Sequence, residues 1–204
     1  MGKTFELSFL SSVTLCCLVT ILASCDVSSA QRANDIPYSE AEQVVSSDPQ
    51  KVVLQLVSGG SQTGLVQSFT VYGDGLVDFQ KRRKDQALEE FTGNIGASGV
   101  QELMSIAVSH GLAEWDADTI MAWTRQKNPR TLNIQDGGNV HVSLHLSEYR
   151  RGDVRMQNHS KSFTVKTPKD AAEVYPEIPQ FRGVHLLWER LAAERKKRLD
   201  QDAP

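Results

Sequence analysis

The sequence predicts an α+β domain, with an antiparallel sheet of about six strands and two main helices packed on one side. Short runs in which apolar and polar residues alternate recur between glycine-rich turns, a pattern typical of strands with one buried face. Two longer stretches, near residues 98–110 and 180–191, repeat apolar residues at helical spacing instead. Strands joined by tight turns pair antiparallel, and the helices are expected to cover the apolar face.

Three runs form the first part of the predicted sheet. Residues 51–57 are β-branched and leucine-rich, and a glycine pair follows them closely. Residues 65–72 alternate cleanly, and residues 76–80 continue the alternation after a short turn. Residues 91–95 are a further candidate strand.

The turn at residues 73–75 can be predicted from the pattern on either side of it. A three-residue loop pairs Val71 with Val77 and Phe69 with Phe79, so all four lie on one apolar face. A two-residue turn would place apolar residues opposite polar ones. Because register follows the buried face, we expect the three-residue loop, with Gly75 in the left-handed region.

The first helix is predicted to start at Ser98. Ser98 and Gln101 match a capping box, and Gly111 supplies a stop signal. Beyond this helix, Trp115 and Trp123 are expected to cover one end of the core.

Residues 132–134 and 140–146 form a second predicted hairpin, in which Ile134 pairs with Val140. The alternation places His141 and His145 on its polar face. On a strand, residues four apart are separated by roughly 13 Å, too far to share one zinc ion. No metal site is predicted.

The next turn, at residues 150–153, contains the tripeptide Arg151-Gly152-Asp153. It resembles the integrin-recognition motif, but a plain hairpin end is the preferred interpretation. A polar insertion at residues 157–162 is expected before Phe163 and Val165 resume the strand.

The last helix is predicted from about Gln180, and its end is strongly basic. Its apolar stripe consists of Phe181, Val184, Leu187, Trp188 and Leu191.

The chain is expected to have three parts. Residues 1–24 are predicted to be a lipoprotein signal peptide, and residues 25–50 a lipid anchor and polar tether. Residues 51–200 are the predicted single globular domain. The tether is rich in small and polar residues and poor in large apolar ones, although residues 39–45 are also compatible with a short helix.

Leu22-Ala23-Ser24-Cys25 resembles the bacterial lipobox, which closes an uncharged run that begins at Leu7. The resemblance implies cleavage before Cys25 and lipidation of its thiol, with fatty acyl chains such as palmitate as the membrane anchor. It also implies a place in the cell envelope, with the domain facing the periplasm or the cell exterior.

Three other interpretations of this segment remain open. An ordinary signal peptide would be cut after Ala30, and an uncleaved span would need about 20 apolar residues. A buried core helix is the third, and it is the least expected at an extreme terminus. The three cysteines are Cys16, Cys17 and Cys25, so the lipoprotein interpretation leaves the mature domain without a free thiol. Disulfides, thiolate metal sites and cysteine nucleophiles are then excluded.

The hairpin has a resemblance of its own. The segment from Phe69 to Gly75 reads Phe-Thr-Val-Tyr-Gly-Asp-Gly, and Thr92-Gly93 precedes the helix near Ser98. These features resemble an "F-x-[LV]-Y-x-D-G" hairpin found in uncharacterised domains of bacterial lipoproteins and secreted proteins. No activity is implied by it.

The function expected from these features is that of a non-catalytic binding module for an envelope protein or a cell-wall component. The formal net charge of −3 gives no reason to expect nucleic acid as a partner. No catalytic or cofactor motif is found, so no catalytic residue or cofactor is predicted. An envelope hydrolase acting on wall or lipid substrates remains the alternative.

Overall fold

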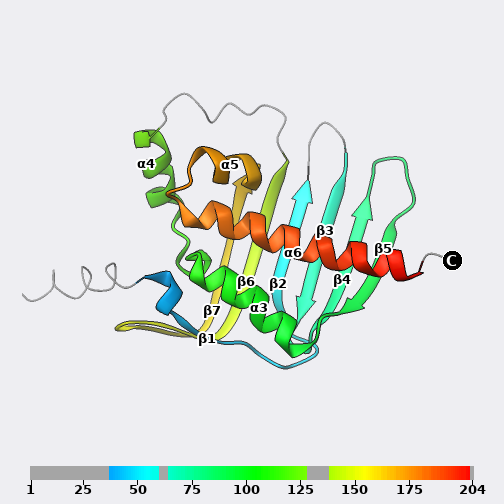
Figure 1. Cartoon of the computed structure of the whole chain (residues 1–204), viewed down its shortest axis with the longest axis horizontal. Helices are drawn as coiled ribbons and strands as arrows, with labels where there is room; N and C mark the ends of the chain where they lie inside the picture. The colour runs from blue at the N-terminus through cyan, green and yellow to red at the C-terminus, as the bar shows by residue number, and fades with distance from the viewer. Residues whose placement is uncertain (1–36, 60–63, 128–137, 203–204) are drawn as a thin grey trace, which may run out of the picture. The chain divides into compact units, whose positions relative to one another are not determined.

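The structure, a computed structural model, describes residues 37–59, 64–127 and 138–202, all within one compact unit that begins at Pro37. The predicted fold class is confirmed: the described residues form a seven-stranded antiparallel sheet with its main helices on one side (Figure 1). In chain order the elements are η1 (Tyr38–Glu40), β1 (Glu42–Val44), β2 (Val52–Gly59), β3 (Val66–Tyr72), β4 (Leu76–Arg82), β5 (Glu89–Asn94), α3 (Gly96–Ser109), η2 (Leu112–Glu114), α4 (Ala117–Lys127), β6 (Asn139–Arg151), β7 (Val154–Lys166), α5 (Pro168–Val174) and α6 (Pro179–Asp202).

The sheet is arranged around β6. β7 pairs with one edge of β6 along its whole length. On the other edge, β2 pairs with residues 139–144 of β6 and β1 pairs with residues 148–150. β3, β4 and β5 follow β2, each antiparallel to its neighbour. Among the described strands, the sheet therefore ends at β7 on one side and at β5 on the other.

The core lies between the sheet and the helices α3 and α6 (Figure 1). α6 crosses the strands: Trp188 meets the ring of Phe69 edge-on, and the Arg195 guanidinium lies 4.2 Å from the ring centre of Phe79. Burial of each large apolar side chain contributes about 1.5–3 kcal/mol, so both helices are held mainly by this face. Their buried apolar residues are Val100, Leu103, Met104, Ala107 and Val108 in α3, and Phe181, Val184, Leu187 and Leu191 in α6.

The predicted three-residue loop of the first hairpin is confirmed. Val71 pairs with Val77 and Phe69 pairs with Phe79. Gly75 has a φ of 94°, in the left-handed region.

The first helix begins earlier than the sequence predicts. α3 starts at Gly96, and the side-chain oxygen of Asn94 accepts a hydrogen bond from the Gly96 N–H at 2.7 Å. Ser98 lies inside the first turn, so the predicted capping box is wrong. Gly111, with a φ of 73°, follows the end of the helix as expected.

β7 is unbroken, so the predicted polar insertion at residues 157–162 is wrong. The loss of alternation has a different cause: the pairing of β6 with β7 passes over Ser147 and Asn158, and Asn158 has a φ of 48°. Beyond this point the alternation of β6 changes phase, so that odd-numbered residues face the core instead of even-numbered ones. Leu146 is buried before the irregularity, and Tyr149 is buried after it.

The structure describes only one strand of the second predicted hairpin, residues 140–146. Residues 132–134 lie outside the described residues. Val140 pairs instead with Ser58 and Val165, and Val142 pairs with Leu56 and Phe163, so β2 and β7 occupy both edges of β6 there.

Residues 38–44, which the sequence assigns to the tether, form η1 and β1. The folded unit therefore starts before residue 51. No helix in the described ranges is long and apolar enough to cross a membrane.

Candidate functional site

Cys25, the one site residue predicted from the sequence, lies outside the described residues, so candidate sites are sought in the geometry of the domain. The sheet has a second face, which points away from α3 and α6 and which we call the polar face. One line of paired residues crosses six strands on this face: Ser162, Ser143, Gln55, Thr70, Asp78 and Thr92. A second line beside it consists of Thr164, His141, Val57, Ser68, Gln80 and Glu90. All twelve residues are exposed or half-buried.

Side chains on the β2–β5 half of the polar face bond to one another across the strands. Asp78 accepts hydrogen bonds from the Tyr72 hydroxyl at 3.2 Å and from the Thr92 hydroxyl at 3.1 Å. The Gln55 amide donates to the Thr70 hydroxyl at 3.3 Å. These bonds hold the side chains in place on the surface.

His141 is the centre of the β6–β7 half. Its Nδ1 lies 3.1 Å from the Thr164 hydroxyl and its Nε2 lies 2.9 Å from the Ser162 hydroxyl. The Ser162 hydroxyl oxygen also lies 3.1 Å from the Ser143 hydroxyl oxygen. A neutral imidazole donates at one nitrogen and accepts at the other, so both hydroxyls can be satisfied in either tautomer.

His145 has a hydroxyl partner of its own, because its Nδ1 lies 2.8 Å from Ser160. As the sequence predicts, His141 and His145 lie on the polar side of the same strand. Within the described ranges, no group of three His, Cys, Asp or Glu side chains is placed to hold a metal ion.

The chemistry of the polar face is that of a hydrogen-bonding surface. Of the twelve residues in its two lines, only Asp78 and Glu90 are acidic and only Val57 is apolar. Hydroxyl and amide groups both donate and accept. The face therefore suits a flat partner rich in neutral polar groups.

The contact between Ser162 and His141 resembles two members of a hydrolytic triad. In such a triad a carboxylate holds the second imidazole nitrogen, whereas Thr164 occupies that position here. Ser162 is also exposed on the sheet surface.

A cleft of about 650 Å³ lies between α4 and the outer edge of β7. Trp115 stacks flat on Phe163 inside it, with ring centres 4.0 Å apart and planes 2° apart. Trp115 is buried as predicted, but Trp123 is 42% exposed, so the predicted role of Trp123 in covering the core is wrong.

The cleft wall is fixed by a buried ion pair that the sequence does not predict. Arg151 Nε donates to Glu114 Oε1 at 2.6 Å, and a second nitrogen of the same guanidinium donates to Glu114 Oε2 at 2.5 Å. The Tyr149 hydroxyl also donates to Glu114. Burial, followed by this hydrogen bond, raises the pKa of Tyr149. Glu114 ends η2 and precedes Trp115, so the pair ties the cleft to β6.

This ion pair also decides how the tripeptide at residues 151–153 is interpreted. The Arg151 side chain is almost completely buried and bound to Glu114. A partner cannot read an arginine that is inside the fold, which leaves a plain hairpin end as the interpretation.

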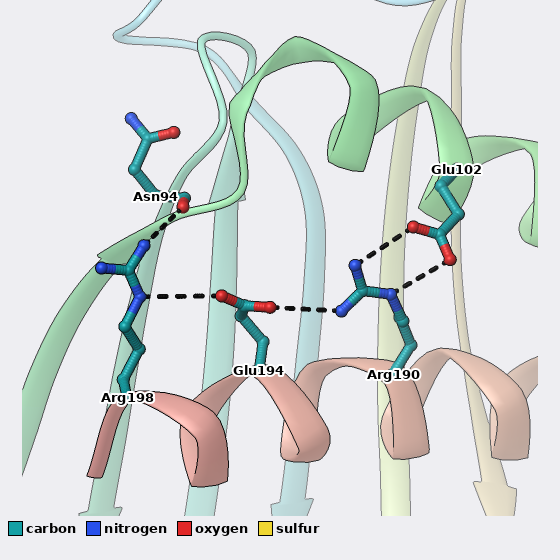
Figure 2. Close-up of polar contacts among 5 residues, drawn as sticks. All are labelled: Asn94, Glu102, Arg190, Glu194 and Arg198. Carbon is teal, nitrogen blue, oxygen red and sulfur yellow. Dashed lines mark hydrogen bonds and ion pairs between the residues drawn. The ribbon is translucent and has the colours of Figure 1, made fainter. Parts of the chain in front are cut away.

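Arginines in the second half of α6 bond to other parts of the domain. Figure 2 shows Glu194 between Arg190 and Arg198, at 3.4 and 3.6 Å. Arg190 also donates to both oxygens of Glu102 on α3 at 3.1 Å, and Arg198 donates to the Asn94 carbonyl at 3.0 Å (Figure 2). These arginines hold α6 against α3 and the end of β5.

The fold and these surfaces define a two-layer α+β domain with one helix-covered sheet face and one hydrogen-bonding face. No protein-family model matches the chain, and a search of the curated proteins finds no match.

Proposed function

We propose that this protein is a bacterial lipoprotein, and that its domain is a non-catalytic binding module for an envelope protein or a cell-wall component. Acyl chains on Cys25 would hold it in a membrane of the cell envelope, with the domain facing the periplasm or the cell exterior. The polar face is the observation that supports a binding role. It is six strands wide, and its side chains are exposed or half-buried.

Three properties of the polar face favour binding over a purely structural role. Its side chains are preorganised by mutual hydrogen bonds, so little conformational freedom is lost on binding. Its two lines contain a single apolar residue, Val57, so they remain hydrated in the unbound protein. Its hydroxyl, amide and imidazole groups match partners that present many hydroxyls or peptide groups.

The test uses the mature chain with Cys25 replaced by serine, so that the protein stays in solution. Immobilised protein is exposed to detergent-solubilised envelope and, separately, to purified cell-wall sacculi. We expect stoichiometric retention of one of the two. Ser143→Lys, which places an ammonium group beside Ser162 on the β6–β7 half of the polar face, should weaken retention by about tenfold or more.

Ser105→Lys is the matched control, because Ser105 is exposed on α3, on the opposite side of the sheet. It should bind as the unmodified chain does. Equal retention by the Ser143 variant and the control would show that the polar face does not bind the retained partner.

One observation favours the alternative of an envelope hydrolase, namely the 2.9 Å contact between Ser162 and His141. A hydrolase of this kind would release soluble fragments from sacculi, or fatty acid from envelope lipid, and would lose that activity in Ser162→Ala. The binding module should release neither product above the rate in buffer. Release that disappears with Ser162→Ala would establish the alternative instead.

A further inference from the structure

β7 is an edge strand among the described residues. Its pairing partner is β6, from Asn139↔Lys166 to Arg151↔Val154, and no described strand pairs with its outer edge. An edge of this kind presents a row of backbone N–H and C=O groups that can accept another strand.

The cleft described above follows this edge. Its lining includes all six consecutive residues 161–166 of β7. Alternate residues of a strand point to opposite faces, so a cavity that contacts every residue in turn must run beside the backbone and not over one face. Six residues of strand extend about 20 Å, which matches an extended peptide of similar length.

The opposite wall is a helix. α4 contributes Ala117, Ile120, Met121 and Thr124 to the lining. Asp116 caps this helix, accepting hydrogen bonds from the Asp118 N–H at 3.1 Å and the Thr119 hydroxyl at 2.7 Å. Met121 and Trp123 are each 42% exposed, so α4 carries two of the large apolar side chains that the domain leaves in water.

The floor of the cleft is apolar and aromatic. Trp115 and Phe163 stack there, and Phe181 of α6 lies beside Trp115 at 6.2 Å between ring centres. The charged residues in the lining are two lysines and one aspartate, a cationic balance. Lys161 donates to the Trp115 carbonyl at 3.2 Å, whereas Lys166 is exposed at the end of β7.

We propose that the groove between α4 and the outer edge of β7 binds an extended peptide segment of a partner protein as an added strand. The segment is apolar at alternate positions, which fill the cleft over Trp115 and Phe163, and it carries an acidic group beside Lys166. Main-chain hydrogen bonds to β7 supply affinity, and the cleft selects the side chains. This inference goes beyond the proposed function, because it assigns a second surface and requires no role for the central residues of the polar face.

A displayed library of random seven-residue peptides, selected against the mature chain with Cys25→Ser, provides the probe. We expect the selected peptides to share apolar residues at every second position and an acid near one end. Methylation of their backbone nitrogens should abolish binding. Hydrogen exchange at the amides of residues 161–166 should slow when the unmethylated peptide is added.

Two alanines on α4 provide matched variants. Ala117 lines the cleft and Ala122 is exposed on the same helix outside the lining. Ala117→Trp should fill the groove and weaken the selected peptides by about tenfold or more, whereas Ala122→Trp should leave their affinity unchanged. Lys166→Glu should weaken acidic peptides and not their amide analogues.

The proposal is overturned if no peptide is enriched, or if the enriched peptides bind Ala117→Trp as well as the unmodified chain. Self-association that Ala117→Trp abolishes, without peptide binding, would assign the groove to a second copy of the chain and also overturn it. The Ser143→Lys variant separates this proposal from the preceding one, because it should bind the selected peptides normally.

Discussion

At the scale of single residues, Glu114 and Arg151 are the most deeply buried ion pair of the residues that the structure describes. The side chain of Arg151 is 4% exposed and that of Glu114 is 18% exposed, and the guanidinium also lies 4.5 Å from the ring centre of Tyr38. The Arg151 side chain therefore joins β6 to both η1 and η2. A buried charge that loses its partner is far more costly than the pair is stabilising.

Glu114→Gln should lower the free energy of unfolding by about 3 kcal/mol, because it leaves the Arg151 guanidinium buried without a carboxylate. Chemical denaturation measures this value. Glu148→Gln is the control: it breaks the pair with Arg155, whose side chain is 61% exposed, and should cost less than about 1 kcal/mol. Equal losses in the two variants would show that Glu114 and Arg151 act as a surface pair.

Tyr149 makes stability depend on pH in the alkaline range. Its pKa is raised in the folded protein from an ordinary value of 10.0, so the unfolded chain loses this proton first. The stabilisation that results from this raised pKa is fully present below pH 10 and is lost as pH rises above it. Tyr149→Phe should cost about 1 kcal/mol at neutral pH and should flatten the decline in unfolding free energy above pH 10. An unchanged slope would contradict this origin.

The ion pair between Glu114 and Arg151 could not be predicted from the sequence. Glu114 and Arg151 are 37 residues apart, and no periodicity connects them. Arg151 also follows the change of phase at Ser147 and Asn158. Its place in the alternation that starts at Val140 would assign it to the polar side. The sequence shows that the alternation breaks, but it does not show which way the side chains turn afterwards.

At the scale of elements, the hairpin of β3 and β4 is the clearest success of prediction, because its turn and its register both follow from one buried face. Gly75 is essential to it. A Cβ at this position would lie 2.6 Å from the backbone of Gly96, at a φ of 94°. The turn residue therefore also controls how closely the start of α3 approaches.

Gly75→Ala should destabilise the domain by more than about 1 kcal/mol, because the new methyl group meets backbone atoms that cannot move aside easily. Thermal unfolding measures the loss. Gly59→Ala is the matched change: no atom lies within 4 Å of its new Cβ, so it should be neutral or slightly stabilising. Similar behaviour of the two variants would mean that Gly75 is not constrained.

Element boundaries were less predictable than element types. α3 begins at Gly96 because Asn94 supplies the oxygen that Ser98 was expected to supply. α4 carries Trp123 outward, although this residue is expected from the sequence to cover one end of the core. Its exposure depends on how α4 packs beside the edge of β7.

At the scale of the whole molecule, the sheet with helices on one side was predictable, because alternating strands and two amphipathic helices require that arrangement. The two candidate surfaces were not. The lines of the polar face depend on the pairing of β2 with β6, two strands that are distant in sequence. The groove depends on where α4 packs, and no local pattern specifies that position.

The proposed anchor makes a prediction for the full-length protein in its own cell. Cys25 should carry acyl chains, so the protein should sediment with membranes, and the intact mass of the mature form should exceed that of the chain starting at Cys25. Cys25→Ser should move the protein to the soluble fraction. A mature form that starts at Gln31 without added lipid would support plain secretion instead.

The position of α6 in the chain order determines when the domain can become ordered. This 24-residue helix follows the entire sheet in sequence, and its contacts with Phe69, Phe79 and Asn94 extend from β3 to β5. A nascent chain that has emerged from the ribosome only as far as β7 would leave in water the apolar side chains that α6 covers, among them Phe69 and Phe79. We therefore expect cooperative folding to wait for translation of α6, which keeps the shorter chain loosely structured and available to chaperones.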